Sequence, residues 1–204
     1  MTSPVARYPV NVDLEGRRAL VVGGGPIALR KVQGLLAAGA RVTVVAPEAV
    51  AGIATHDRIR WHRRAYRRGE VASYRVAVTA TGRPEVDGQV YRDGEAAGVL
   101  VNAADDPEHC SFTLPAIVRR GSVTVAVSTD GRSPALAAWL RRRLEGEAEL
   151  WAGLAEVAGD VRGELRATRG TSEHDGWPAA LEEAAAVLRR HLGVGDARPG
   201  PGAG

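Results

Sequence analysis

Short apolar runs alternate with longer segments of helical periodicity over the first half of the chain. Residues 19–22 (ALVV) and 41–47 (RVTVVAP) are apolar and rich in valine, which is typical of buried strands in a parallel sheet. Between them, residues 26–38 repeat apolar positions at close to helical spacing, with Pro26 in the first turn and Gly39 at the end. This stretch predicts a strand–turn–helix–strand unit of about 30 residues.

The same alternation continues to residue 105. Strands are predicted at 59–61, 74–81 and 99–105, and a helix is predicted over 84–98. Strands and helices in alternation favour an α/β fold of the Rossmann type. Such a fold is a doubly wound parallel sheet that binds its ligand at the carboxyl ends of the strands.

The pattern changes after residue 106. A turn-rich connection comes first, then a predicted strand at 122–129, a predicted helix over 135–145, and further helices from residue 147. We therefore expect four parts: a dinucleotide-binding domain over 1–111, a small strand–helix module over 112–146, a helical C-terminal part over 147–194 and a disordered tail over 195–204.

Composition narrows the class of protein. The chain has 204 residues, of which 45% are apolar, so it can bury a sizeable core. No stretch reaches the roughly 18 to 20 consecutive apolar residues that span a membrane. The N-terminal segment lacks a basic stretch followed by an apolar core, and the single cysteine, Cys110, excludes an internal disulfide framework. A cytoplasmic protein without membrane association is therefore expected.

The net charge of +3 raises the question of nucleic-acid binding. The basic residues are scattered, and aromatic residues make up only 4% of the chain, too few for a base-stacking platform. No nucleic-acid partner is therefore expected. Lys31 is the only lysine, and the excess of arginine also suits a small polyanionic substrate, because guanidinium groups pair bidentately with carboxylates.

A glycine-rich turn connects the first predicted strand to the first predicted helix. The sequence GGGPIA at 23–28 fits the G-x-G-x-x-A form of the dinucleotide-binding fingerprint. In this interpretation Gly23 allows the tight turn, Gly25 lets backbone N–H groups approach a pyrophosphate, and Ala28 allows close packing of helix and strand. A glycine-rich turn without a ligand is the alternative. A P-loop is excluded because no G-K-[ST] follows the glycines.

The second predicted strand bears on the choice of dinucleotide. It ends in Val-Val-Ala-Pro-Glu, so Glu48 comes slightly later than the usual ribose-binding acid. No arginine stands at this strand tip to hold a 2′-phosphate. NAD is therefore expected in preference to NADP.

Several segments in order resemble the precorrin-2 dehydrogenases, the siroheme-synthase N-terminal family. The family core G-G-G-x-[IV]-A-x-R-K is matched by residues 23–31, and AVTATGRPEVD at 77–87 resembles a nucleotide-contacting loop. Residues 101–145 resemble the catalytic and dimerisation segment. The resemblance covers residues 8 to about 146 and is more specific than the glycines alone.

The resemblance implies an activity and an assembly. Members of the family oxidise precorrin-2 to sirohydrochlorin with NAD, on the way to siroheme, and some also insert ferrous iron. They form homodimers through the segment that follows the nucleotide domain. Together with the glycine turn, the resemblance predicts these cofactor-binding residues: Gly23, Gly25, Pro26, Ile27, Ala28, Ala46, Pro47, Glu48, Thr79, Ala80, Thr81 and Asn102.

The resemblance also implies a catalytic residue. An aspartate in the family's V-N-x-x-D segment is the proposed acid–base group, and Asp105 matches its position. A carboxylate at the end of a strand beside the cofactor is well placed to accept a proton. The alternative is that Asp105 only opens a turn with Asp106 and Pro107, because Asp-Asp-Pro is a favourable turn sequence.

A small-hydroxyl turn lines the tetrapyrrole site in the family. Ser128, Thr129 and Arg132 match it and are the predicted substrate-binding residues, since the substrate carries many carboxylates. The chain departs from the family pattern at Asp130, where the family often has glycine.

No metal site is predicted, because His109 and Cys110 are adjacent and the other histidines show no ligand spacing. Three alternative functions stay open. The first is a bifunctional dehydrogenase and sirohydrochlorin ferrochelatase. The second is an NAD-sensing regulatory module, which would need the glycine turn but not Asp105. The third is an unrelated dehydrogenase for a small substrate, which would need a substrate domain larger than the chain has room for.

Overall fold

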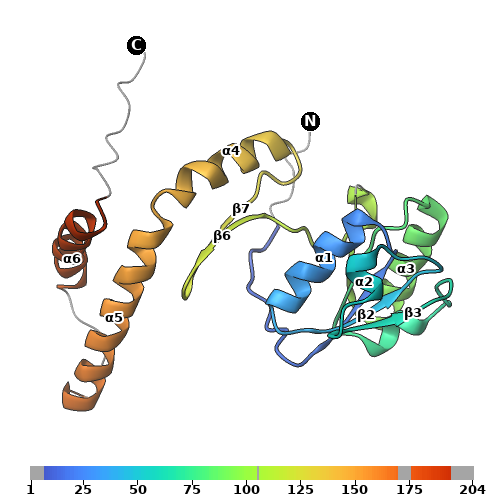
Figure 1. Cartoon of the computed structure of the whole chain (residues 1–204), viewed down its shortest axis with the longest axis horizontal. Coiled ribbons are helices and arrows are strands. Elements are labelled where there is room, and N and C mark those ends of the chain that lie inside the picture. The colour runs from blue at the N-terminus through green and yellow to red at the C-terminus, as the bar shows by residue number, and fades with distance from the viewer. Residues whose placement is uncertain (1–6, 105, 170–175, 194–204) are drawn as a thin grey trace, which may run out of the picture. The chain divides into compact units, whose positions relative to one another are not determined.

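A computed structural model describes residues 7–104, 106–169 and 176–193 (Figure 1). The chain divides into two compact units, the first ending at Leu114 and the second beginning at Pro115. The predicted tail at 195–204 lies outside the described residues.

The first unit is built on a sheet of five parallel strands in the order β3-β2-β1-β4-β5. The strands are β1 (Arg18–Val22), β2 (Arg41–Val45), β3 (Ile59–His62), β4 (Val76–Thr79) and β5 (Leu100–Ala103). The winding direction reverses between β1 and β4, and sheets of this kind bind their ligands at such a switch point. The predicted Rossmann-type sheet is confirmed.

Helices cover both faces of this sheet. The helices α1 (Pro26–Ala37) and α2 (Ala51–Ala54) lie on one face, and α3 (Pro84–Ala97) lies on the other (Figure 1). Successive β1 side chains alternate between the two layers, so that Leu20 packs with the α3 layer and Val21 with the α1 layer. From Ala19 to Val22 the strand is apolar because both of its faces are buried there.

Two connections in this unit are made by short 3₁₀ helices. The crossover from β3 to β4 contains only η1 (Glu70–Ser73), and η2 (Pro107–His109) follows β5. Because η1 is so short, the β2–β3 edge has less cover on the α3 face than the rest of the sheet has.

The second unit contains an antiparallel hairpin and three helices. The elements are β6 (Ala116–Arg120), β7 (Val123–Val127), α4 (Pro134–Glu145), α5 (Ala148–Arg169) and α6 (Trp177–Leu192). The predicted helical C-terminal part is confirmed over its described residues. No helix in the described ranges is long and apolar enough to cross a membrane.

The strand β6 is not predicted from the sequence pattern, which indicates only its partner β7. The residues Gly121 and Ser122 form a two-residue connection between AIVRR and VTVAV. Such a connection between two β-prone runs is typical of a hairpin. The arginines at 119 and 120 interrupt the apolar alternation of the first run, which conceals it as a strand.

Candidate functional site

The glycine turn joins the carboxyl ends of three strands. Gly23 follows β1 and has a φ of 122°, and its N–H donates to the Val45 carbonyl oxygen at the end of β2 (3.0 Å). A Cβ at this position would collide with the backbone carbonyl of Ala80, in the loop after β4. A glycine therefore allows the loops after β1 and β4 to touch.

Gly24 and Gly25 have opposite surroundings. A Cβ on Gly24 would collide with the carbonyl oxygen of Glu48 and with Ala49, and the Gly24 carbonyl oxygen accepts the N–H of Val50 (2.9 Å). A Cβ on Gly25 would meet no atom within 4 Å. Gly24 is thus closed against the loop after β2, whereas Gly25 borders open space.

The start of α1 supplies backbone donors beside this open space. The first helical hydrogen bond runs from the Leu29 N–H to the Gly25 carbonyl oxygen (3.0 Å), so the N–H groups of Ile27 and Ala28 precede the helical ladder. No side chain caps this end, and Pro26 has no N–H. A helix N-terminus attracts phosphate groups, so this turn fits the pyrophosphate of a dinucleotide.

The loop after β2 is tied to β3. The Ala46 N–H donates to the His62 carbonyl oxygen (3.2 Å), and the Ala46 carbonyl oxygen accepts the indole N–H of Trp61 (3.0 Å). Pro47 and Glu48 are exposed. Within the described part of the chain the Glu48 carboxylate forms no ion pair, so its oxygens are available to the hydroxyls of a ribose. The contribution of Trp61 is not foreseen from sequence.

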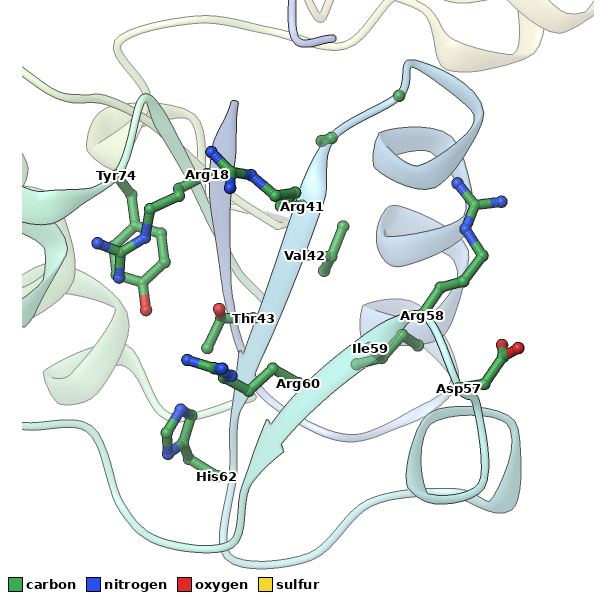
Figure 2. Close-up of a pocket in the computed structure, with 12 residues that line it drawn as sticks. Arg18, Arg41, Val42, Thr43, Asp57, Arg58, Ile59, Arg60, His62 and Tyr74 are labelled. Atoms are coloured by element: carbon green, nitrogen blue, oxygen red, sulfur yellow. The ribbon is translucent and has the colours of Figure 1, made fainter. Parts of the chain in front are cut away.

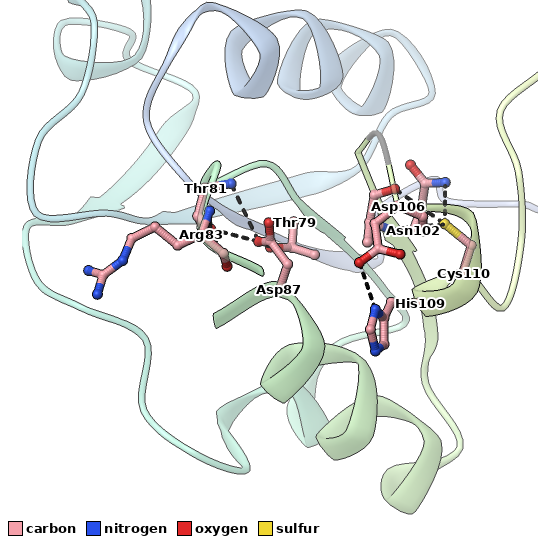
Figure 3. A network of polar contacts seen from close by, with 9 residues as sticks. Thr79, Thr81, Arg83, Asp87, Asn102, Asp106, His109 and Cys110 are labelled. Atoms are coloured by element: carbon pink, nitrogen blue, oxygen red, sulfur yellow. Dashed lines mark hydrogen bonds and ion pairs between the residues drawn. The ribbon is translucent and has the colours of Figure 1, made fainter. Parts of the chain in front are cut away.

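The loop after β4 is organised by a buried carboxylate that the sequence analysis missed. Thr79 donates a short hydrogen bond to Asp87 of α3, and the Thr81 hydroxyl donates to the same oxygen (2.8 Å) (Figure 3). The Thr81 N–H points to that oxygen as well (3.4 Å), and Asp87 is 5% exposed. The predicted cofactor residues Thr79 and Thr81 therefore use their hydroxyls to fix the loop. A Thr-x-Thr pair shortly before a helical aspartate is the signal that could have identified Asp87.

We expect Asp87→Ala to lower the free energy of unfolding by about 2–3 kcal/mol, because it removes a charged acceptor and leaves a buried hydroxyl unpaired. Chemical denaturation followed by circular dichroism measures this loss. Glu85→Ala on the same helix is the matched control, because Glu85 is exposed and forms a surface ion pair with Arg83 (2.9 Å). Equal losses in the two variants would contradict a structural role for Asp87.

At the end of β5, the Asn102 and Cys110 side chains connect the strand to the segment 110–112 that follows it. The Asn102 side-chain amide donates to the Phe112 carbonyl oxygen (3.0 Å), and Cys110 Sγ accepts the N–H of Ala103 (3.2 Å). Figure 3 shows Asn102 beside Cys110. Burial raises the pKa of the Cys110 thiol, so it stays protonated. The predicted cofactor residue Asn102 therefore has its amide nitrogen engaged by the protein.

Asp105, the predicted catalytic residue, lies outside the described residues. The residues on both sides of it are hydrogen-bonded to strand ends. The Ala104 N–H donates to the Thr79 carbonyl oxygen at the end of β4 (2.8 Å), and the Asp106 N–H donates to the Ala103 carbonyl oxygen at the end of β5 (3.4 Å). These anchors place the flanking backbone at the ends of β4 and β5, close to the loop that Asp87 fixes.

Asp106 is paired with a histidine. Its carboxylate oxygen lies 2.6 Å from His109 Nδ1 (Figure 3). This hydrogen bond holds the pKa of Asp106 below its ordinary value, which makes the group a weaker proton acceptor. Among the described residues, no three His, Cys, Asp or Glu side chains come together as a metal site would require.

The predicted substrate-binding residues lie in the turn between β7 and α4, in the second unit. The Thr129 hydroxyl accepts the Ser133 N–H (3.1 Å), and the Arg132 N–H donates to the Thr129 carbonyl oxygen (2.9 Å). The Ser128 hydroxyl accepts the N–H of Asp130 (3.2 Å). Both hydroxyls therefore stabilise the turn by accepting its backbone N–H groups, whereas the Arg132 side chain is exposed.

The departure at Asp130 has a conformational explanation. Asp130 has a φ of 50°, in the left-handed region where glycine is favoured and aspartate is tolerated. We expect Asp130→Gly to change the free energy of unfolding by less than about 0.5 kcal/mol, and Asp130→Val to lower it by about 1–2 kcal/mol. Thermal unfolding of the two variants measures the difference. Equal stability would show that backbone conformation does not govern this position.

Comparison with known proteins gives a family match for each of the two units. Residues 10–116, more than half of the chain, match a family described as putative NAD(P)-binding, and residues 120–147 match the central region of sirohaem biosynthesis proteins. The siroheme synthase of Psychrobacter arcticus is 36% identical over 184 residues, which cover 86% of this chain and 33% of that protein. The siroheme synthase of Nitrosococcus oceani is 44% identical over 140 residues, which cover 67% of this chain and 30% of that protein. The chain thus spans about a third of the length of these relatives.

A solved structure provides a match of similar length. The precorrin-2 dehydrogenase SirC superimposes with a TM-score of 0.67 and 28% identity, over 92% of this chain and 100% of that chain. The two matched families follow one another along the chain, and the first includes the glycine turn and the loops that meet it. The chain therefore belongs to the precorrin-2 dehydrogenase and siroheme synthase N-terminal family, whose first part is the NAD(P)-binding domain.

Proposed function

We propose that the protein oxidises precorrin-2 to sirohydrochlorin with NAD, in siroheme biosynthesis. The observation that carries the proposal is the open space at Gly25, in a turn where Gly23 and Gly24 close against the loops after β4 and β2. The chain is also similar over 92% of its length to a precorrin-2 dehydrogenase. The match to that enzyme extends over both units, so it includes the segment after the dinucleotide site as well as the site itself.

The residues of the first unit bind and orient the cofactor. When bound, NAD supplies the hydride acceptor. The N–H groups at the start of α1 hold its pyrophosphate, and Glu48 accepts hydrogen bonds from the ribose of the adenosine half. Pro26 and Ile27 line the turn beside Gly25. Asp87 keeps the loop after β4 in place, so that the backbone from 79 to 81 borders the cofactor.

We assign proton removal to Asp105. Loss of a hydride from the macrocycle must be accompanied by loss of a proton, and a carboxylate can accept it. Of the two adjacent aspartates, Asp106 is already hydrogen-bonded to His109, and its pKa is held below the ordinary value. Asp106 is thus committed to His109, and we give the role to Asp105, the residue that matches the family's acid–base position.

The second unit binds the tetrapyrrole and forms a homodimer in this proposal. The exposed Arg132 and the Ser128 hydroxyl offer donors to the substrate's carboxylates, and Thr129, whose hydroxyl donates to the Ser133 carbonyl oxygen (3.1 Å), fixes the turn that carries them. The unit also exposes large apolar side chains, including Leu136 and Trp139 of α4, both 47% exposed. Burial in a dimer would remove this surface from water. The organisation into a dinucleotide-binding domain, a dimerisation module and a helical part, in the cytoplasm, belongs to the same proposal.

An anaerobic assay with enzymatically generated precorrin-2 and NAD tests the activity. We expect one NADH for each sirohydrochlorin formed, both followed by absorbance. If NAD binds without any turnover, the enzymatic assignment fails and an NAD-sensing module becomes the better explanation. Ferrous iron is added in a second step, because the relatives are named siroheme synthases and siroheme contains iron. Enzyme-dependent loss of sirohydrochlorin at that step would identify a bifunctional enzyme.

A further inference from the structure

A hollow in the first unit lies away from the glycine turn. It has a volume of about 790 Å³ and extends over β1, β2 and β3 (Figure 2). Basic side chains gather on one side of β2 within it, and we call three of them the basic cluster: Arg18, Arg41 and Arg60. His62 lines the hollow at the other end of β3, where its carbonyl oxygen accepts the Ala46 N–H of the loop after β2 (3.2 Å). A pocket of this size accommodates a small organic ligand, but its charged lining differs from the mostly apolar lining of ordinary ligand pockets.

Strand register explains why these side chains share a face. Arg18 of β1 is the direct partner of Arg41 in β2, and Thr43 of β2 is the direct partner of Arg60 in β3. Side chains two residues apart on a strand point to the same face, so Arg41 and Thr43 lie on one side. Neighbouring strands are about 4.8 Å apart, so Arg18, Arg41 and Arg60 start from neighbouring positions on three adjacent strands. The Arg41 Nε–H donates to the Gly16 carbonyl oxygen (2.7 Å), which leaves its terminal nitrogens for a ligand.

This face is uncovered because of the crossover that follows β3. On this face α3 packs against β5, and the chain between β3 and β4 contributes only the four-residue η1. Tyr74, which follows η1, borders the hollow, and the Arg18 guanidinium lies 4.6 Å from its ring centroid. The cluster is therefore accessible from solvent within its own unit.

The charge of the cluster is not balanced by the protein. In the described part of the chain, no carboxylate lies within ion-pair distance of Arg18, Arg41 or Arg60. Asp57 is the acid among the described lining residues, and it lies 3.4 Å from His56. Like charges on directly opposed strand positions repel, so the arrangement costs stability unless an anion neutralises it.

The cluster is separate from the dinucleotide site. Arg18 begins β1, whereas Gly23 follows its end, five residues along an extended chain. At about 3.3 Å for each residue, the two positions are roughly 16 Å apart. One pyrophosphate cannot reach both.

We propose that the basic cluster binds a small polyanion that carries at least two phosphate or carboxylate groups. Guanidinium groups bind both kinds of oxyanion bidentately. Several anionic groups are needed because the cations come from three strands. This site takes its ligand whether or not the glycine turn holds NAD.

Isothermal titration calorimetry on the full chain, at low salt and with saturating NAD to fill the glycine turn, tests the proposal. The two probes are tripolyphosphate and benzenehexacarboxylate, which represent the phosphate and carboxylate sources. We expect one site for each chain, with binding weakened about tenfold or more by Arg60→Gln. Arg60 is the variant of choice because none of its described neighbours pairs with it, so the free protein should unfold at an unchanged or higher temperature.

Arg162→Gln, on the exposed surface of α5, is the control with the same change in net charge, and its affinity should stay within about twofold of the parent. The probe that binds more tightly identifies the source of the ligand. Absence of binding by both probes overturns the proposal, and so does equal weakening in the two variants. Because no turnover is measured, failure here is distinct from failure of the dehydrogenase assignment.

Discussion

Turnover of precorrin-2 is expected to fall by about a hundredfold or more in Asp105→Asn, while the affinity for NAD stays within about twofold. Asparagine keeps the size and hydrogen-bonding character of a turn residue but cannot accept the proton. Steady-state NADH formation gives the first quantity, and calorimetric titration of NAD gives the second. A folded variant with near-normal turnover would leave Asp105 with the role of opening a turn.

Asp106→Asn is the matched control at the adjacent position. Asp106 accepts a hydrogen bond from His109, which asparagine can still accept through its amide oxygen. We expect its turnover to stay within about threefold of the parent, because its depressed pKa already makes it a poor base. If Asp106→Asn is the inactive variant and Asp105→Asn is active, the catalytic assignment moves by one residue.

The sheet of the first unit was predictable because its strands are buried on both faces. Runs such as ALVV at 19–22 are apolar at every position, and Gly and Pro mark the helices between them. The strand at Ala116–Arg120 escaped prediction because two arginines at its end break the apolar alternation. Its partner, VTVAV, is predicted because it contains no charged residue and four of its five residues are β-branched.

The chemistry of the site was less predictable than its position. The loops that carry the predicted cofactor residues do meet at the glycine turn, since parallel strands end at one edge of the sheet. However, Thr79, Thr81 and Asn102 have their side-chain groups engaged by Asp87 and the 110–112 segment. These partners are distant contacts between elements, and local pattern does not encode them.

The glycine fingerprint does not distinguish the structural role of Gly24 from the ligand-binding role proposed for Gly25. The pattern assigns roles to Gly23 and Gly25 and treats Gly24 as a variable position. In the structure Gly24 is the residue whose hydrogen is enclosed by backbone atoms of Glu48 and Ala49. A sequence pattern records which positions tolerate only glycine, but it does not distinguish a contact with protein from a contact with ligand.

Two neighbouring alanine substitutions are therefore expected to have different effects, one on stability and the other on NAD binding. Gly24→Ala should lower the free energy of unfolding by about 2–4 kcal/mol, because its Cβ overlaps a backbone carbonyl that cannot rotate away. Gly25→Ala should change stability by less than about 1 kcal/mol, since its φ of −82° suits alanine and the added Cβ meets no atom within 4 Å, while alanine is a poorer N-cap than glycine. Chemical denaturation of the free protein measures both values.

NAD titration completes the comparison. The methyl group of Gly25→Ala projects into the space assigned to the pyrophosphate, so we expect the dissociation constant for NAD to rise about tenfold or more in a fully folded protein. Gly24→Ala should lose NAD binding only in proportion to the protein that unfolds. Unchanged NAD affinity in Gly25→Ala would mean that the open space beside Gly25 is not the cofactor site. A parent-like stability of Gly24→Ala would mean that the loop after β2 can move away from the turn, and the closed arrangement of the strand ends would then not be essential to the fold.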